Sequence, residues 1–190
     1  ASGVTLSMGT NGTARLNLTL GSASVGSVDG TLNVYSTGTN GLLSNSGTLS
    51  IGSAGFIADG GGANNTDFTL TATGTLKIAS ATGISTTAGV GNIRFTGTRT
   101  YNSGSEIIYN GSAAQVTGNG LPTNSDITID NVNGVVLTAA LTTTRTLTMT
   151  NGQLDLANTN LSVGALTGST NISHATGVAG ARTISVTGNT

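Results

Sequence analysis

Short runs of alternating apolar and polar residues recur along this chain, and each run is followed by Gly, Asn or Ser. The clearest copies begin with Gly-Thr-Leu and lie at residues 30–34, 47–51 and 74–78. Looser copies lie at residues 146–149, 153–156 and 160–163. Alternation with a period of two is typical of β-strands that bury one face. Its repetition along the whole chain predicts a stacked architecture, in which each copy packs on the next.

The spacing of these copies indicates a parallel β-helix. The leucines at positions 141, 147, 154 and 161 are 6, 7 and 7 residues apart, so three strands with their turns would form a coil of about 20 residues. The Gly-Thr-Leu copies are 17 and 27 residues apart, which indicates corner loops of variable length. The single proline, Pro122, agrees with this fold because proline interrupts the hydrogen bonds of a strand ladder.

The sequence therefore predicts an all-β fold, a parallel β-solenoid with short strands and Gly/Asn turns. No linker divides the chain, so residues 1–190 are expected to form a single continuous domain. A β-sandwich is the alternative, because short strands between regularly spaced turns would also suit that fold.

Composition excludes several classes of function. Charged residues make up 7% of the chain and Lys and Arg together number 6, whereas nucleic acid and anionic membrane surfaces both require clustered cations. The chain has no Cys, which excludes disulfides, Cys-type zinc sites and a thiol nucleophile. No apolar run approaches the length that spans a bilayer. We expect no nucleic-acid partner, no membrane insertion and no cofactor.

The acidic residues do not form a recognisable active site. They are Asp29, Asp59, Asp67, Glu106, Asp126, Asp130 and Asp155. Only Asp126 and Asp130 fall on one predicted strand, and four residues at about 3.3 Å each separate them by roughly 13 Å. Glycosidase carboxylates lie about 5–9.5 Å apart. Acids on neighbouring coils remain an open alternative, and turn or capping roles are favoured. His174 lacks a nucleophile-elbow motif and is expected at the surface. The chain is predicted not to be an enzyme, with no catalytic, cofactor or metal residues.

Three other features suggest ligands. The loop from Asp59 to Asp67, with three consecutive glycines, offers hard oxygen ligands of the kind that calcium prefers, although an exposed excursion is favoured. Phe95, Tyr101 and Tyr109 are the aromatic concentration that would stack on a sugar, with a core position favoured for Phe95. Threonines 69, 71 and 73, and the alternate threonines from 142 to 150, are expected to form outward rows. Ice binding would need a constant period, and a solvated strand face is favoured.

The region from Thr98 to Leu161 carries a resemblance to a known class of protein. Its segments TYNSGSEIIYNGSAAQVTG and LPTNSDITIDNVNGVVLTAALTTTRTLTMTNGQLDLANTNLSVG resemble the repeat modules of large secreted surface proteins of Bacteroidetes-type bacteria, which are often substrates of the type IX secretion system. Their residue pattern is also similar to that of the passenger repeats of autotransporter adhesins. Matching positions include Leu121-Pro122, Gly134-Val135 and Asn151-Gly152. The resemblance implies an extracellular, repetitive, structural or adhesive protein.

The two ends of such a solenoid are open sheet edges. Residues 1–20 and 183–190 show the same strand-like residue pattern as the rest of the chain, with no predicted capping helix and few charges. Because an unsealed edge pairs with another strand, we expect head-to-tail self-association, or continuation into neighbouring repeats of a longer chain. Head-to-tail contact does not close on itself, so it yields a fibre.

The expected function is that of an extracellular bacterial structural protein, a surface adhesin or a fibre-forming subunit located outside the cell or on its surface. Surface glycans are considered as further partners. The alternatives are a carbohydrate-active β-helix enzyme and a module that binds glycan or calcium.

Overall fold

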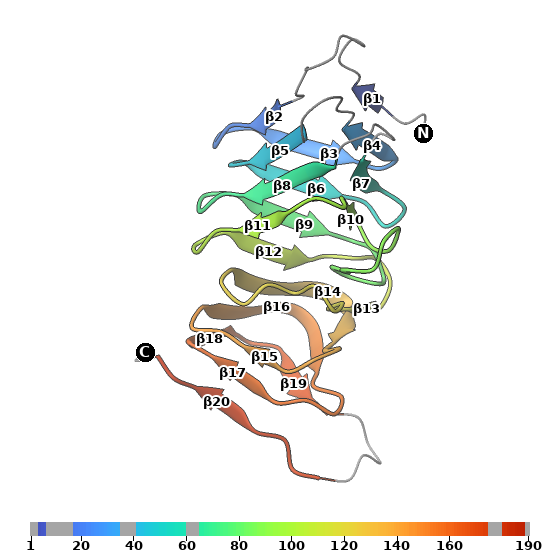
Figure 1. Ribbon diagram of the computed structural model, residues 1–190. Coiled ribbons are helices and arrows are strands. Elements are labelled where there is room, and N and C mark those ends of the chain that lie inside the picture. The colour runs from blue at the N-terminus through green and yellow to red at the C-terminus, as the bar shows by residue number, and fades with distance from the viewer. Residues whose placement is uncertain (1–3, 7–16, 35–40, 60–64, 175–179, 189–190) are drawn as a thin grey trace.

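The computed structural model is a β-solenoid of about seven turns (Figure 1), and it describes residues 4–6, 17–34, 41–59, 65–174 and 180–188. Every paired strand in the described residues runs parallel to its neighbour, and these residues contain no helix. The strands stack along one long axis from the N-terminal to the C-terminal end. The predicted fold is confirmed, and the β-sandwich alternative is wrong.

The N-terminal half has three-sided coils, and each coil visits sheets B, C and A in that order. Sheet A contains β1 (Val4–Leu6), β4 (Thr31–Val34), β7 (Phe56–Asp59) and β10 (Ile93–Arg94). Sheet B contains β2 (Asn17–Leu20), β5 (Gly41–Asn45), β8 (Thr66–Leu70) and β11 (Arg99–Tyr101).

Sheet C is the side that runs the full length of the solenoid. Its first strands are β3 (Val25–Val28), β6 (Thr48–Ile51), β9 (Thr75–Ile78), β12 (Glu106–Tyr109) and β13 (Gln115–Val116). Its later strands are β14 (Asp126–Val136), β16 (Thr146–Asp155), β18 (Ala165–Gly168) and β19 (Asn171–Ser173). Sheet D lies in the C-terminal half and contains β15 (Leu141–Thr142), β17 (Leu161–Val163) and β20 (Ile184–Val186).

Stacked aliphatic side chains form the core beneath sheet C. The inward residues at one register position are Leu49, Leu76, Ile107, Ile127 and Leu147, and each is at most 2% exposed. From Leu49 onward the intervals between these residues are 27, 31, 20 and 20. The predicted coil of about 20 residues therefore holds for the C-terminal half. The 31-residue coil is longer because residues 79–92 leave the corner between β9 and β10 before the chain returns.

In the C-terminal half, β14 and β16 bend around a corner, so that sheet C covers two sides of the solenoid. The register between them shifts after Ile129 and again between Asn131 and Val135. Gly134 and Gly152 lie at this bend with φ of 85° and 76°, a region that L-residues other than glycine rarely adopt. A Cβ on Gly152 would lie 1.8 Å from the carbonyl oxygen of Asn131. The three-sided coil thus continues without a separate third sheet.

Buried amides satisfy the backbone at the corners. The Asn92 side chain donates to the carbonyl oxygens of Gly52 and Gly55 and accepts from the Ser80 amide. Gln115 donates to the carbonyl oxygens of Ile78 and Ser80. Because a buried polar group without a partner destabilises the fold, these two residues stabilise the corners that follow β6 and β9.

Candidate functional site

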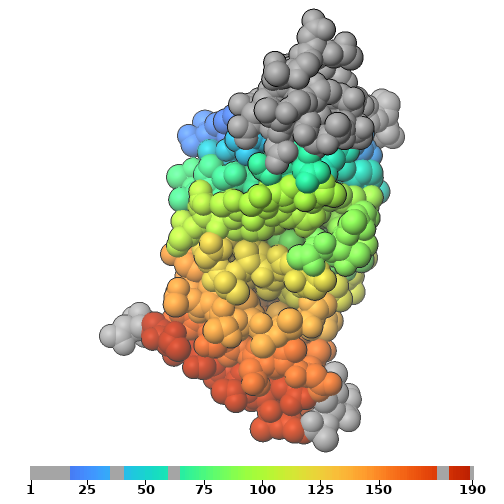
Figure 2. Space-filling model, viewed as in Figure 1, coloured from blue at the N-terminus to red at the C-terminus, as the bar shows by residue number. Residues whose placement is uncertain are grey.

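The last described strand exposes two residues that occupy core positions. On β20, Ile184 and Val186 stand in register with Leu161 and Val163 of β17, which are 1% and 0% exposed. Ile184 and Val186 themselves are 48% and 42% exposed. They point inward as their partners do, but no described coil covers them. Figure 2 shows residues 184–188, in red, at the surface of the C-terminal end.

The same coil leaves core positions half-covered on its two other sides. Leu166 on β18 is in register with Leu147, and Ile172 on β19 is in register with Leu154. Leu147 and Leu154 are fully buried, whereas Leu166 and Ile172 are only partly buried. Among the described strands, β18 and β20 are the terminal strands of their sheets. Each therefore presents one edge without a described partner.

The N-terminal end repeats this pattern with weaker exposure. On β2, Leu18 and Leu20 point inward and are partly buried, although Leu43, the partner of Leu18, is fully buried. Val25, on the outward face of β3, is 79% exposed. Of the four most exposed large apolar residues in the described ranges, three lie on end strands, and the fourth, Val132, is 76% exposed at the bend of β14.

No charge or proline blocks the end strands. The strands β2, β3, β18, β19 and β20 contain no Asp, Glu, Lys, Arg or Pro. Proteins usually protect an exposed sheet edge with such residues or with a covering helix. The ends of this solenoid are therefore open to strand addition, as far as the described residues define them.

The structure brings together two carboxylates that sequence spacing did not pair. Glu106 on β12 stands directly opposite Asp126 on β14, on the outer face of sheet C. They line a recess of about 380 Å³ with the hydroxyls of five threonines, which are Thr73, Thr75, Thr128, Thr146 and Thr148. Register between coils places them together, and no spacing within one strand reveals it. Asp130, the predicted strand mate of Asp126, is also on β14, but a register shift precedes it.

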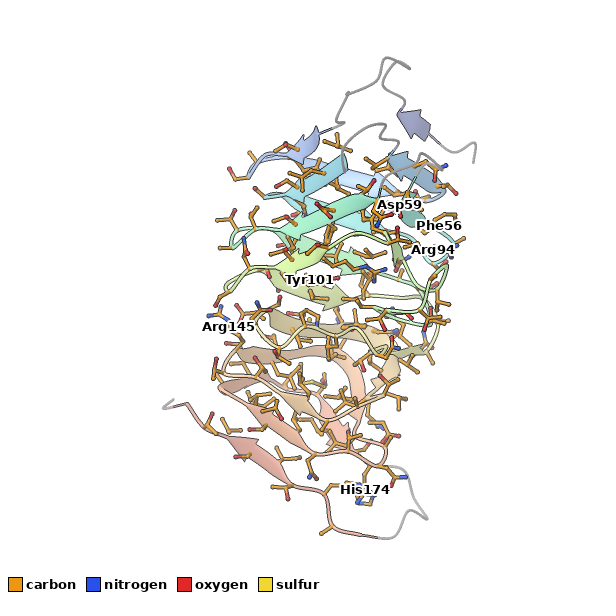
Figure 3. All side chains as sticks on the ribbon, in the orientation of Figure 1. Phe56, Asp59, Arg94, Tyr101, Arg145 and His174 are labelled. Carbon is orange, nitrogen blue, oxygen red and sulfur yellow. The ribbon has the colours of Figure 1, made fainter. Side chains whose placement is uncertain are left out.

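Both carboxylates of the recess already have partners. Glu106 Oε1 accepts from the Thr128 hydroxyl at 2.9 Å. Asp126 Oδ2 pairs with Arg145 Nη2 at 2.6 Å, and Asp126 Oδ1 accepts from the Thr146 amide at 2.9 Å. Figure 3 shows Arg145 at one edge of the solenoid in this view. The ion pair offsets one of two like charges that oppose each other on neighbouring strands.

Three other acidic residues hold backbone amides in place. Asp155 does so within a local turn, the role favoured from sequence, whereas Asp59 and Asp67 also link segments of neighbouring coils. Asp59 accepts from the Thr66 amide at 2.6 Å and from the Thr96 amide at 2.8 Å. Asp67 and Asp155 also accept from backbone amides. Within the ranges that the structure describes, no three His, Cys, Asp or Glu residues gather as a metal site. Residues 60–64 of the candidate calcium loop lie outside those ranges. His174 follows β19 and is exposed.

The aromatic residues considered as a sugar platform pack into the core, as favoured for Phe95. Phe95 and Tyr109 are 2% and 0% exposed, and Phe68 packs against Phe95 and Tyr101 with ring centroids 6.2 and 5.8 Å away. Tyr101 and Tyr109 point inward because they are in register with the core residues Leu70 and Ile78, and Phe95 follows β10 directly. Tyr109 donates its hydroxyl to the carbonyl oxygen of Thr117 at 2.7 Å. The Tyr101 hydroxyl is buried without a partner, and burial raises the pKa of Tyr101 to about 12.

The predicted threonine rows hold for Thr146 and Thr148, which share the outer face of β16, but are wrong for most of the other positions. Thr69 belongs to β8, whereas Thr71 and Thr73 lie in the turn that follows. Thr142 belongs to sheet D, and the threonines from position 146 belong to sheet C. A corner, which period-two alternation does not reveal, separates them. Threonines instead meet across coils, where the hydroxyls of Thr148 and Thr167 are 3.0 Å apart.

In the part of the chain that the structure describes, no helix is long and apolar enough to cross a membrane. No protein-family model, curated protein or solved structure matches this chain.

Proposed function

We propose that this chain is an extracellular bacterial structural protein, a surface adhesin or fibre subunit whose solenoid is extended end to end by further β-coils. The exposure of Ile184 and Val186 at core positions of β20 carries this proposal. Burying the remaining half of each side chain would contribute about 1 kcal/mol. Each end-to-end contact would also pair the free backbone edge of β20 with a terminal strand of the next copy.

The geometry of such a contact supports a fibre. The C-terminal end of one solenoid would meet the N-terminal end of another, so the two surfaces differ and the contact does not close. The chain has 7% charged residues and no Cys. A surface rich in hydroxyl and amide groups and a fold without disulfides both suit an extracellular surface protein. The proposed role is structural rather than catalytic, because the carboxylates accept hydrogen bonds that hold turns and coils together.

Ile184→Asp tests the proposal, with Val132→Asp as the matched control. Both substitutions place a carboxylate at an exposed aliphatic residue, but Val132 lies on the side of the solenoid. In light scattering across a concentration series, the unaltered chain and Val132→Asp should form particles that grow with concentration and appear as filaments by negative-stain microscopy. Ile184→Asp should remain monomeric. A monomeric unaltered chain, or assembly by Ile184→Asp equal to that of the control, would contradict the proposal.

The recess on sheet C supports a second proposal, contact with surface glycans. Two carboxylates and five threonine hydroxyls line it, and such groups exchange hydrogen bonds with sugar hydroxyls. In affinity electrophoresis through gels that contain soluble neutral polysaccharides, the unaltered chain should be retarded. Glu106→Gln should be retarded less, whereas Thr48→Val, on the same sheet but outside the recess, should migrate as the unaltered chain does. Because Glu106→Gln changes the net charge, each migration is divided by that of the same variant in a gel without polysaccharide, and equal ratios for all three contradict glycan binding there.

A further inference from the structure

The alternation of the end strands restricts the register of the contact between two copies, an inference that rests on the proposed end-to-end assembly. We propose that β20 of one copy pairs in parallel with β2 of a second copy. In this pairing Ile184 lies beside Leu18, Val186 lies beside Leu20, and Ser185 lies beside Thr19. The occupant of the open C-terminal edge is then the β2 strand of another copy of this chain.

The two strands have matching inward and outward faces. Inside the solenoid, Ile184 continues the inward ladder of Leu141 and Leu161, and Leu18 begins the inward ladder of Leu43 and Phe68. Pairing β20 with β2 joins these two apolar ladders. A one-residue slip would set the inward leucines against outward serine, so the burial pattern fixes the alternation.

The outward residues match as well. Thr19 is in register with Ser44, and Ser44 with Thr69, on the outer face of sheet B. Ser185 is in register with Ser162 on the outer face of sheet D. A Ser185–Thr19 neighbour pair therefore repeats the hydroxyl pairs already present along both sheets. Neither strand carries a charge, so no like charges oppose each other in this register.

Chain order places β2 and β20 on the same side of the coil. In the N-terminal half each strand of sheet B is followed by a strand of sheet C, as β2 is followed by β3. In the C-terminal half sheet D takes this place, because β15 leads into β16 and β17 leads into β18. The D side at the C-terminal end is thus the counterpart of the B side at the N-terminal end.

The pitch of the coil excludes direct pairing of β3 with β18 on sheet C. Successive sides lie progressively further along the axis, and β20 follows β18 by two sides. Since β2 comes one side before β3, placing β3 directly on β18 would put β2 at the level that β20 already occupies. Pairing β2 with β20 avoids this overlap and leaves one strand position between β18 and β3 of the next copy.

Cysteine cross-linking tests this register, because the chain has no Cys of its own. Thr19→Cys and Ser185→Cys are purified separately, mixed in equal amounts and exposed to a mild oxidant. Neighbouring strands lie about 4.8 Å apart, within the Cα separation of about 4.4–6.8 Å that a disulfide spans. Ser44→Cys replaces Thr19→Cys in the control mixture. Ser44 lies one strand further from the contact, at about 10 Å, which is too far for a disulfide.

The expected result on a non-reducing gel is a disulfide-linked dimer as the main product of the Thr19→Cys and Ser185→Cys mixture. Each variant alone, and the Ser44→Cys control, should give only background dimer. If light scattering shows assembly but the mixture does not exceed the control, the register is wrong and the proposed function stands. If scattering shows no assembly of the unaltered chain, the proposed function is wrong and the register inference is overturned with it.

Discussion

Truncation of one core leucine tests how strongly the stacked coils depend on each other. Leu76 is fully buried and lies in register between Leu49 and Ile107. Leu76→Ala removes three carbons, which at about 0.8 kcal/mol each gives about 2.4 kcal/mol of lost transfer free energy. Because stacked neighbours on both sides hold the cavity open, we expect a total loss of about 2.7–5 kcal/mol, the range of buried leucine truncations.

Leu166→Ala is the matched control, since Leu166 is at the same register position on the C-terminal coil but is only partly buried. Its truncation should cost about 1 kcal/mol. Urea unfolding followed by far-ultraviolet circular dichroism measures both free energies, and the slope with denaturant shows whether a central cavity uncouples the two halves. A loss below about 1 kcal/mol for Leu76→Ala, or equal losses for both variants, would refute the continuous core.

Three further predictions concern the bend, the buried tyrosines and the ion pair. Gly152→Ala should destabilise the chain more than Gly89→Ala in urea unfolding, because both glycines have positive φ but only a Cβ on Gly152 meets a backbone oxygen; equal losses would contradict the close approach. Burial raises the pKa of Tyr101 from 10.0 to about 12, so the unfolded chain releases that proton first and stability should fall as pH rises from 10 to 12. Between pH 8 and pH 11 the thermal unfolding temperature should fall less for Tyr101→Phe than for the unaltered chain. An equal fall for both would contradict the role of Tyr101. Arg145→Met should lower the free energy of unfolding in urea by less than about 1 kcal/mol, because the pair with Asp126 is partly exposed. The difference from the unaltered chain should shrink in high salt, which screens the pair. A larger difference that does not change with salt would contradict this prediction.

The sequence predicts which residues of each strand point inward, because alternation with a period of two needs no knowledge of the partner strand. The stack of Leu49 and Leu76 follows from two of the Gly-Thr-Leu copies. The first copy does not join it, because Leu32 lies on β4 in sheet A. The coil of about 20 residues follows from the leucine spacing where corners are short. Residues 79–92 have no such pattern, so the length of their coil was not predictable.

What the sequence leaves open is contact across coils and around corners. Glu106 and Asp126 meet because β12 and β14 pair in one register, and a single sequence does not state the partner of a strand. Thr142 and Thr146 appear as one row, although a corner turns them onto different sheets. Phe95, Tyr101 and Tyr109 fit either a sugar platform or a core by composition. Strand register places Tyr101 and Tyr109 beside core residues, and Phe95 packs against Phe68.

The excursion of residues 79–92 shows what a corner of this solenoid tolerates. It adds a segment between β9 and β10, anchored by the buried Ile84, while β9 and β12 on either side stay in register. Since lengthening a surface loop costs little closure entropy, foreign peptides grafted at this corner should be displayed without altering the scaffold. A fibre of such units would then display the grafted peptides at a regular spacing, once per copy of the chain.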